Sequence, residues 1–209
     1  MSIAGQQYEA EELARLLLKD KKILNSSGGG VTFSGGEPLL QADFIREVFG
    51  LLKKEGLHTA IETASNVKWE AFEKVLTLTD LFICDIKAFD AALHREGTGA
   101  GNGQILENLK RLDKAGAKIL FRIPVIPGYN DTEEAVLEIG SFVESLGAKH
   151  PVELLAFHNI CAGKYDALGR KFAVRNVKAP TGEFMEHLKS SLEGHALKEE
   201  HNLEVIWKP

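Results

Sequence analysis

The chain has 209 residues, and a single hydrophobic core serves proteins of up to roughly 250 residues, so we expect one domain over 1–209. Its 44% hydrophobic and 26% charged residues are typical of a globular protein, and a net charge of −5 gives no basic footprint for nucleic acid or an anionic membrane. The sequence contains neither an apolar run of the roughly 20 residues that span a bilayer nor a secretory signal pattern at residues 1–14. We therefore expect a cytoplasmic protein that binds neither nucleic acid nor membrane.

Helical and strand patterns alternate along the chain. Apolar residues recur at helical spacing in some segments, and short apolar runs bounded by turn residues occur in others. Helices are predicted over 9–23, 41–55, 68–76, 103–115, 130–146 and 182–197, and strands over 30–33, 57–62, 80–85, 117–124, 152–157 and 203–207. Asn130 or Asp131 is predicted to cap its helix, with Glu134 in a capping box. The glycine-rich segment 97–103 and the segment after residue 157 are predicted as loops.

This alternation, with short connections, predicts parallel strands joined by right-handed βαβ units, in a doubly wound sheet or an open or closed β/α barrel. Polar residues lie at or just past the carboxyl ends of five predicted strands: Ser34 and Glu37, Glu62 and Thr63, Asp85 and Lys87, Arg122, and His158. A doubly wound sheet would draw its site mainly from loops at one switch point. In β/α barrels, by contrast, many strands contribute to one site at this face, so the pattern favours a barrel-like arrangement.

Several of these residues have chemistry suited to a ligand. Asp85 and Lys87 are two residues apart, so on a strand both point to the same face, as one acceptor and one donor for a ligand or as a surface ion pair. Glu62 and Thr63, with Asp85, offer hard oxygen ligands for a cation, although a hydrogen-bonded strand end is the alternative. Arg122 interrupts an apolar strand and needs a partner, because burying an unpaired charge is costly. A ligand carboxylate or Asp85 would serve, and a core salt bridge is the alternative.

The cysteines and histidines give weaker signals. Cys84 lies within an apolar strand and is predicted to be core, and Cys161 lies in the loop after His158. Two cysteines do not make a disulfide framework, and reduced thiols are expected. His158 is equally compatible with a ligand contact and with a structural role. The other histidines have no ligand spacing and are predicted to be surface residues: His58, His94, His150, His187, His195 and His201.

The segment 26–41 reads S-S-G-G-G-V-T-F-S-G-G-E-P-L-L-Q and predicts a strand, a ligand-facing turn and a helix. Its glycines allow close approach to a ligand and positive φ, and Pro38 suits the start of a helix. The segment resembles the signature of radical S-adenosylmethionine enzymes that activate glycyl radical enzymes, the pyruvate formate-lyase activating type. Further segments resemble the same family in the same order: 57–63, 80–87, 122–128 (R-I-P-V-I-P-G), 154–165 and 165–169 (Y-D-A-L-G).

The resemblance implies a fold, a chemistry and a set of site residues. The fold is a partial β/α barrel of parallel strands that lacks its first strand unit. An electron donor such as flavodoxin or ferredoxin reduces a [4Fe-4S] cluster, which passes the electron to S-adenosylmethionine. The resulting 5′-deoxyadenosyl radical takes a hydrogen atom from a glycine of the partner, a glycyl radical enzyme. The site residues it implies are Gly35, Gly36 and Glu37 at the methionine amino group, Asp85, Ile86 and Lys87 along the cofactor, Arg122 and His158 completing the pocket, and Glu62, Thr63 and Asp85 at a monovalent cation. Glu62 stands where this family usually has Asp.

One departure from the family is an absence. The family holds its cluster with C-x-x-x-C-x-x-C, and this motif does not occur in the sequence. The sequence therefore predicts an N-terminally truncated activating enzyme that is inactive as it stands, with no catalytic residue assigned. Two alternatives remain open. One is a non-catalytic module that binds S-adenosylmethionine or the partner, and the other is a different barrel enzyme in which Asp85, Lys87 and His158 act as acid, base or nucleophile, with Lys87 as a Schiff-base lysine.

Overall fold

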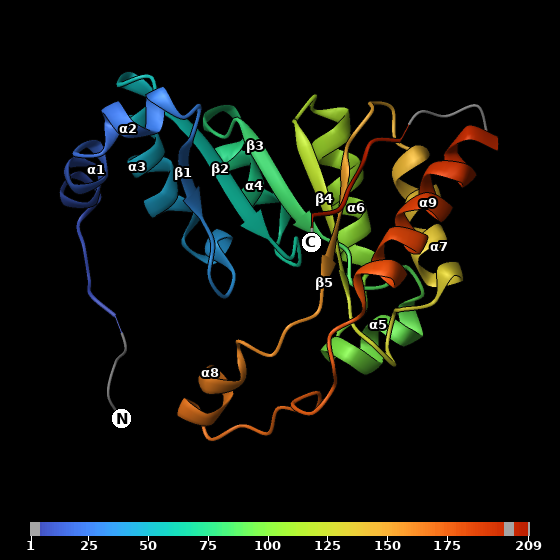
Figure 1. Cartoon of the computed structure of the whole chain (residues 1–209). Coiled ribbons are helices and arrows are strands. Elements are labelled where there is room, and N and C mark those ends of the chain that lie inside the picture. Colours follow the sequence, from blue (N-terminus) through green and yellow to red (C-terminus); the bar gives the residue numbers. More distant parts are fainter. Residues whose placement is uncertain (1–4, 199–202, 209) are drawn as a thin grey trace. The chain divides into compact units, whose positions relative to one another are not determined.

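The protein is an α/β protein with six strands that follow one another in the order β1-β2-β3-β4-β5-β6 (Figure 1). The computed structural model describes residues 5–198 and 203–208. The strands are β1 (Gly30–Phe33), β2 (His58–Thr63), β3 (Leu81–Asp85), β4 (Ile119–Val125), β5 (Val152–Ala156) and β6 (Val205–Ile206). The pairings of β1 with β2, β2 with β3, β4 with β5 and β5 with β6 are all parallel, as the alternation of elements predicts.

Helices connect the strands. They are α1 (Ala10–Leu18), α2 (Lys21–Ser26), α3 (Ala42–Lys54), α4 (Trp69–Val75), α5 (Ala91–Thr98), α6 (Gly103–Lys114), α7 (Glu133–Glu144), α8 (Ala162–Ala167) and α9 (Gly182–Lys198). Two short 3-10 helices, η1 (Pro38–Gln41) and η2 (Leu76–Leu78), precede α3 and follow α4. No helix within the described part of the chain is both long enough and apolar enough to cross a membrane.

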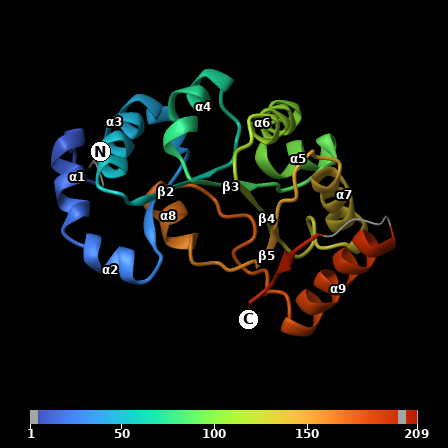
Figure 2. The ribbon, with the colours of Figure 1, turned by 90° about the horizontal axis from the view of Figure 1, so that it is seen from above.

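The chain divides into two compact units, of which the first comprises Met1–Cys84 and Glu107–Ile119. In this unit α3 and α4 lie on the same side of β1, β2 and β3 (Figure 2). Phe72 and Phe82 are fully buried, with ring centroids 5.9 Å apart, and join α4 to β3. A β-carbon on Gly30 would lie 2.2 Å from the His58 carbonyl oxygen, so glycine at this position allows β1 to pair closely with β2.

The second unit comprises Asp85–Leu106 and Leu120–Pro209. Its strand β5 lies between β4 and β6, and α7 and α9 pack together on the same side of these strands (Figure 2). The two helices approach closely at Gly140, where a β-carbon would lie 2.6 Å from Leu192 Cδ2. Phe121 and Ile123 of β4 are fully buried, while Arg122 between them points to the other face.

The structure differs from the predicted local structure in four places. The helix α5 was not predicted; it begins with Asp90 accepting a hydrogen bond from Leu93 N at 2.7 Å and ends at Gly99 with φ +80°, while residues 99–102 of the glycine-rich segment form a loop, as predicted. The cap of α7 is Thr132, whose hydroxyl accepts from Ala135 N, rather than Asn130 or Asp131. The predicted helix 9–23 is two helices, α1 and α2, and the long loop after β5 contains the short α8.

Two histidines predicted at the surface are buried. His94 is 4% exposed, because its ring lies beneath the end of α5 with Nδ1 2.8 Å from the Ala100 carbonyl oxygen. His150 is 5% exposed and packs edge-to-face on Phe121, with ring centroids 5.6 Å apart. Both burials depend on contacts that helical or strand spacing does not reveal. Cys84 is fully buried, as predicted, and His201 lies outside the described residues.

Candidate functional site

The turn after β1 exposes the backbone of two glycines. Gly35 has φ +127°, a conformation that favours glycine, and both Gly35 and Gly36 are exposed. A β-carbon on either glycine would meet no atom within 4 Å beyond its chain neighbours. The space beside these two peptide groups is therefore open.

Glu37 fixes this turn through its side chain. Its carboxylate accepts hydrogen bonds from Leu39 N at 3.1 Å and Ala64 N at 3.1 Å, and Thr63 Oγ1 lies 2.8 and 2.9 Å from its two oxygens. The first bond caps η1, while the others join the turn to the carboxyl end of β2, 26 residues along the chain. We name this set of bonds the Glu37 clamp. It keeps the Gly35–Gly36 turn in one conformation at the edge of the parallel strands.

The end of β2 is also tightly organised. Thr63 is 3% exposed, and its Oγ1 accepts a hydrogen bond from Ser65 N at 2.9 Å. Ser65 is fully buried with φ +59°, and its carbonyl oxygen accepts from Asn108 Nδ2 of α6 at 2.9 Å. Within the described residues, Ser65 Oγ is buried without a hydrogen-bond partner. The Thr63 hydroxyl, which the sequence assigns to a cation, is thus engaged in two hydrogen bonds, and Glu62 precedes it on the opposite face of the strand.

In the second unit, the predicted pair at the end of β3 is formed. Lys87 Nζ lies 3.0 Å from Asp85 Oδ2, and both side chains are between a quarter and a third exposed. The peptide between them is held by Ile86 N, which donates to the Arg122 carbonyl oxygen at 2.8 Å. The pair is therefore fixed in position while remaining accessible to a polar ligand.

Asn130 is a site-supporting residue that the sequence analysis missed. It is 1% exposed, and its Nδ2 donates to the carbonyl oxygens of Lys87 and Pro124, both at 2.7 Å. Its Oδ1 accepts from Ile126 N, also at 2.7 Å. These three bonds join the segment after β3 to the segment after β4. An Asn directly after the P-V-I-P-G-Y run could have signalled a turn-stabilising side chain.

Arg122 differs from its predicted placement. It lies in the middle of β4 rather than at a strand end, and its Nε donates to Glu153 Oε2 at 2.5 Å. Glu153 is the register partner of Arg122 on β5, so parallel pairing places the two side chains together. An ion pair is the alternative to a ligand contact that the sequence left open for Arg122. His158 lies two residues past the end of β5 and is exposed.

The cysteines do not form a site for an iron–sulfur cluster in the described part of the chain. Cys84 is fully buried in β3, and Cys161 is partly exposed at the start of α8. Among the described residues, no three His, Cys, Asp or Glu side chains gather closely enough to hold a metal ion. A [4Fe-4S] cluster requires several cysteine thiolates, so these residues do not fit one.

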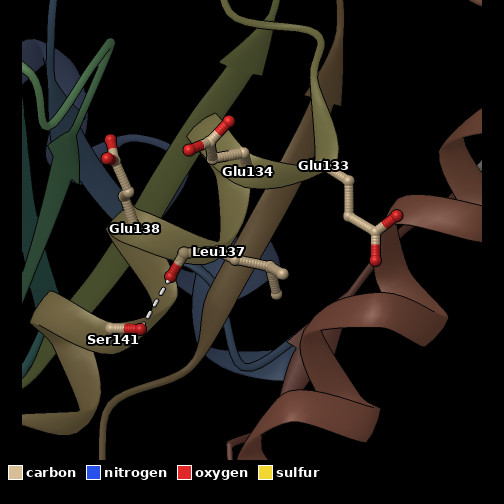
Figure 3. A pocket seen from close by; sticks show the side chains of 5 residues that line it. All are labelled: Glu133, Glu134, Leu137, Glu138 and Ser141. Atoms are coloured by element: carbon tan, nitrogen blue, oxygen red, sulfur yellow. Dashed lines mark hydrogen bonds between the residues drawn. The ribbon is translucent and has the colours of Figure 1, made fainter.

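A surface pocket of about 510 Å³ lies elsewhere in the second unit. It is lined by Glu133, Glu134, Leu137, Glu138 and Ser141, all from α7 (Figure 3). Ser141 Oγ donates to the Leu137 carbonyl oxygen within the helix, and the first two glutamates lie in the first turn, where acidic side chains suit the helix dipole. This pocket contains none of the predicted site residues.

Comparison with known proteins identifies relatives over most of the chain. A model of the Radical SAM superfamily matches residues 2–139. The (2S)-3-sulfopropanediol dehydratase activating enzyme of Klebsiella oxytoca is 39% identical over 186 residues, which are 88% of this chain and 59% of that protein. The pyruvate formate-lyase 1-activating enzyme of Escherichia coli is 34% identical over 196 residues, which are 93% of this chain and 80% of that protein. The chain thus spans between about three fifths and four fifths of these relatives.

Solved structures share the fold. A domain of a pyruvate-formate lyase-activating enzyme from Bacteroides vulgatus superposes with a TM-score of 0.69 and 25% identity, covering 86% of this chain and 99% of that one. Streptococcus suis SuiB bound to S-adenosylmethionine superposes with a TM-score of 0.72, covering 100% of this chain and 45% of the SuiB chain. Its sequence identity of 15% supports a shared fold only. These likenesses confirm the predicted partial β/α barrel of parallel strands. The chain belongs to the radical SAM superfamily and, within it, to the activating enzymes of the pyruvate formate-lyase type.

Proposed function

We propose that this chain is the core domain of an activating enzyme that uses S-adenosylmethionine to remove a hydrogen atom from a glycine of a partner enzyme, and that the chain alone is inactive because it lacks the cysteine ligands of a [4Fe-4S] cluster. The observation that carries the proposal is the open Gly35–Gly36 turn, fixed by the Glu37 clamp at the carboxyl end of β1. It occurs in a chain that is 34% identical to the pyruvate formate-lyase 1-activating enzyme of Escherichia coli over 80% of that protein. The partner is a glycyl radical enzyme, and a flavodoxin or ferredoxin serves as electron donor.

In the first unit, we assign recognition of the methionine amino group to Gly35, Gly36 and Glu37. An ionised carboxylate has about four acceptor sites, and the Glu37 clamp uses three of them, for Leu39 N, Ala64 N and the Thr63 hydroxyl. One acceptor site stays available for an ammonium group. Because the clamp fixes the carboxylate before a ligand arrives, little conformational entropy is lost when the ligand binds.

In the second unit, we assign polar contacts with the cofactor to Asp85, Ile86 and Lys87, and further contacts to Arg122 and His158. Asp85 supplies acceptors and Lys87 donors on one face, and Asn130 keeps the backbone of this segment in place. Arg122 Nε is paired with Glu153, and its contact with the cofactor is assigned from the family resemblance alone. When bound, S-adenosylmethionine supplies the hydrogen-abstraction chemistry. A monovalent cation at Glu62, Thr63 and Asp85 stays a prediction.

Calorimetric titration with S-adenosylmethionine tests the residues of each unit separately. Gly36→Val fills the open space of the first unit, and Lys87→Met removes a donor in the second. The matched controls are Gly194→Val in α9, where a β-carbon also meets nothing within 4 Å, and Lys110→Met, an exposed lysine of α6. We expect each test variant to bind at least about tenfold more weakly than the parent, a change of about 1.4 kcal/mol, and the controls to bind as the parent does.

Two outcomes contradict the assignment. No heat of binding to the parent at millimolar S-adenosylmethionine would show that these residues do not form a binding site by themselves. Unchanged affinity in Gly36→Val or Lys87→Met would show that the ligand binds elsewhere. Catalysis is tested with dithionite as reductant, by chromatographic detection of 5′-deoxyadenosine. We expect no 5′-deoxyadenosine from this chain alone, and formation of this product would show that the chain is catalytic as it stands.

A further inference from the structure

A basic segment in the second unit has no role in the function proposed above. Residues 159–178, which we call the basic arm, leave the end of β5, pass through α8 and return to α9 (Figure 1). The basic arm contains five Lys or Arg residues and one Asp, which gives it a net charge of +4, whereas the whole chain carries −5. The rest of the chain therefore carries −9. Such a separation of charge creates a local positive field on an otherwise acidic protein.

Most of this positive charge is not neutralised within the protein. Arg175 pairs with Asp166, the acidic residue of the basic arm. The other four cations are exposed and form no ion pair with a described residue: Lys164, Arg170, Lys171 and Lys178. Structural ion pairs therefore do not account for them, and an anionic partner can reach all four.

Large apolar side chains are exposed among these cations. Ile160 is 80% exposed and Leu168 is 69% exposed. Exposed aliphatic residues are common one at a time, but here two flank a helix of six residues, α8. Apolar side chains surrounded by charged ones match the usual anatomy of a protein interface, which has an apolar centre and a polar rim.

The basic arm is held in one conformation by its own contacts. The Tyr165 and Phe172 rings pack with centroids 4.7 Å apart, and Phe172 also stacks on Phe157 at the end of β5. Arg170 N donates to the Tyr165 carbonyl oxygen at 2.9 Å, across a turn in which Gly169 has φ +62°. A preorganised surface loses little entropy on binding, so these contacts favour a recognition role.

We propose that the basic arm is a docking surface for an acidic protein, with Ile160 and Leu168 entering apolar sites on that partner. An acidic protein fits better than nucleic acid because the two most exposed large apolar side chains of the basic arm, Ile160 and Leu168, are aliphatic, whereas the less exposed Tyr165 ring packs on Phe172. It fits better than an anionic membrane because the −9 of the rest of the chain is repelled by an extended anionic surface, and α8 is too short for an interfacial helix. The inference does not depend on the chemistry proposed above.

The test measures binding of a fluorescent random copolymer of glutamate and tyrosine by anisotropy, at low and at physiological ionic strength. Two double variants change the basic arm: Lys171→Glu with Lys178→Glu, and Ile160→Asn with Leu168→Asn. The control is Lys110→Glu with Lys149→Glu, which makes the same change of charge at two exposed lysines outside the arm. All of these side chains are exposed, so circular dichroism spectra and S-adenosylmethionine binding are expected to match the parent.

We expect the parent to bind the copolymer more weakly as salt rises, because screening shortens the reach of exposed charges to about 8 Å at physiological ionic strength. The arm charge variant is expected to bind about tenfold more weakly and the apolar variant several-fold more weakly, with the control within about twofold of the parent. Equal losses in the arm and control charge variants would overturn the proposal. So would tighter binding to duplex DNA or to phosphatidylserine vesicles than to the copolymer.

Discussion

The Glu37 clamp predicts that one hydroxyl at the end of β2 contributes strongly to stability. Replacing Thr63 by valine keeps the shape and the β-branched character of the side chain but removes Oγ1. This atom donates to the Glu37 carboxylate and accepts from Ser65 N, and Thr63 is 3% exposed. Thr63→Val therefore removes two hydrogen bonds from a region that water does not reach.

The expected loss can be worked from these contacts. A hydrogen bond to a charged group contributes about 1.5–3 kcal/mol, and leaving the buried Ser65 N–H without an acceptor costs about 1–3 kcal/mol. The added methyl group returns about 1 kcal/mol through apolar burial. We therefore expect the free energy of unfolding to fall by about 3 kcal/mol, which in a protein of this length lowers the Tm by roughly 6–12 °C.

The assay is urea and thermal unfolding followed by circular dichroism, combined with hydrogen exchange at individual amides. The Ser65 amide is expected to exchange faster in Thr63→Val, because it has lost its acceptor. Thr32→Val is the control, since Thr32 is exposed on β1 and its replacement is expected to change stability by less than about 0.5 kcal/mol. If Thr63→Val unfolds at the same urea concentration as the parent, the Glu37 clamp does not stabilise the turn.

Three further predictions concern other contacts. Gly97→Ala is expected to lower the free energy of unfolding by about 2 kcal/mol, because the β-carbon of alanine would lie 2.4 Å from the Tyr129 ring. This loss outweighs the better helix propensity of alanine. A higher urea midpoint than that of the parent would contradict the close contact between Gly97 and Tyr129. Asn130→Asp is expected to lower stability by about 3 kcal/mol or more, because it sets a carboxylate oxygen 2.7 Å from two carbonyl oxygens; calorimetry that finds an unchanged Tm at neutral pH would refute it. Burial raises the pKa of Asp80, but hydrogen bonds from Lys53 and Thr59 outweigh this and hold the pKa below its ordinary value of 3.8. The contribution of Asp80 is therefore present above that value and lost as the pH falls through the lowered pKa, so Asp80→Asn should flatten the acid side of the stability–pH curve, and an unchanged acid limb would count against it.

Sequence patterns were sufficient to locate most of the elements and the open turn. Short apolar runs between glycines placed β1 over its full length and the ends of β2 and β5 within one or two residues. The Gly35–Gly36 turn and the Asp85–Lys87 pair were likewise readable, because both depend on neighbours within a few positions. Periodicity did not reveal α5, whose last two residues lie in the glycine-rich segment predicted as a loop. Of the glycines in this segment, Gly97 is where the helix packs against the Tyr129 ring, and Gly99 ends the helix.

By itself, the sequence determined the α/β class, the parallel direction of the strands and the residues of the turn, because these follow from local propensity and from the spacing of apolar side chains. The tertiary structure alone decided which polar groups meet. Glu37 pairs with Thr63, Arg122 with Glu153, and Asn130 with the Lys87 carbonyl. These partners lie 26 to 43 residues apart along the chain. The strand register and the path of each connection bring them together, and neither is encoded in the pattern of any one segment.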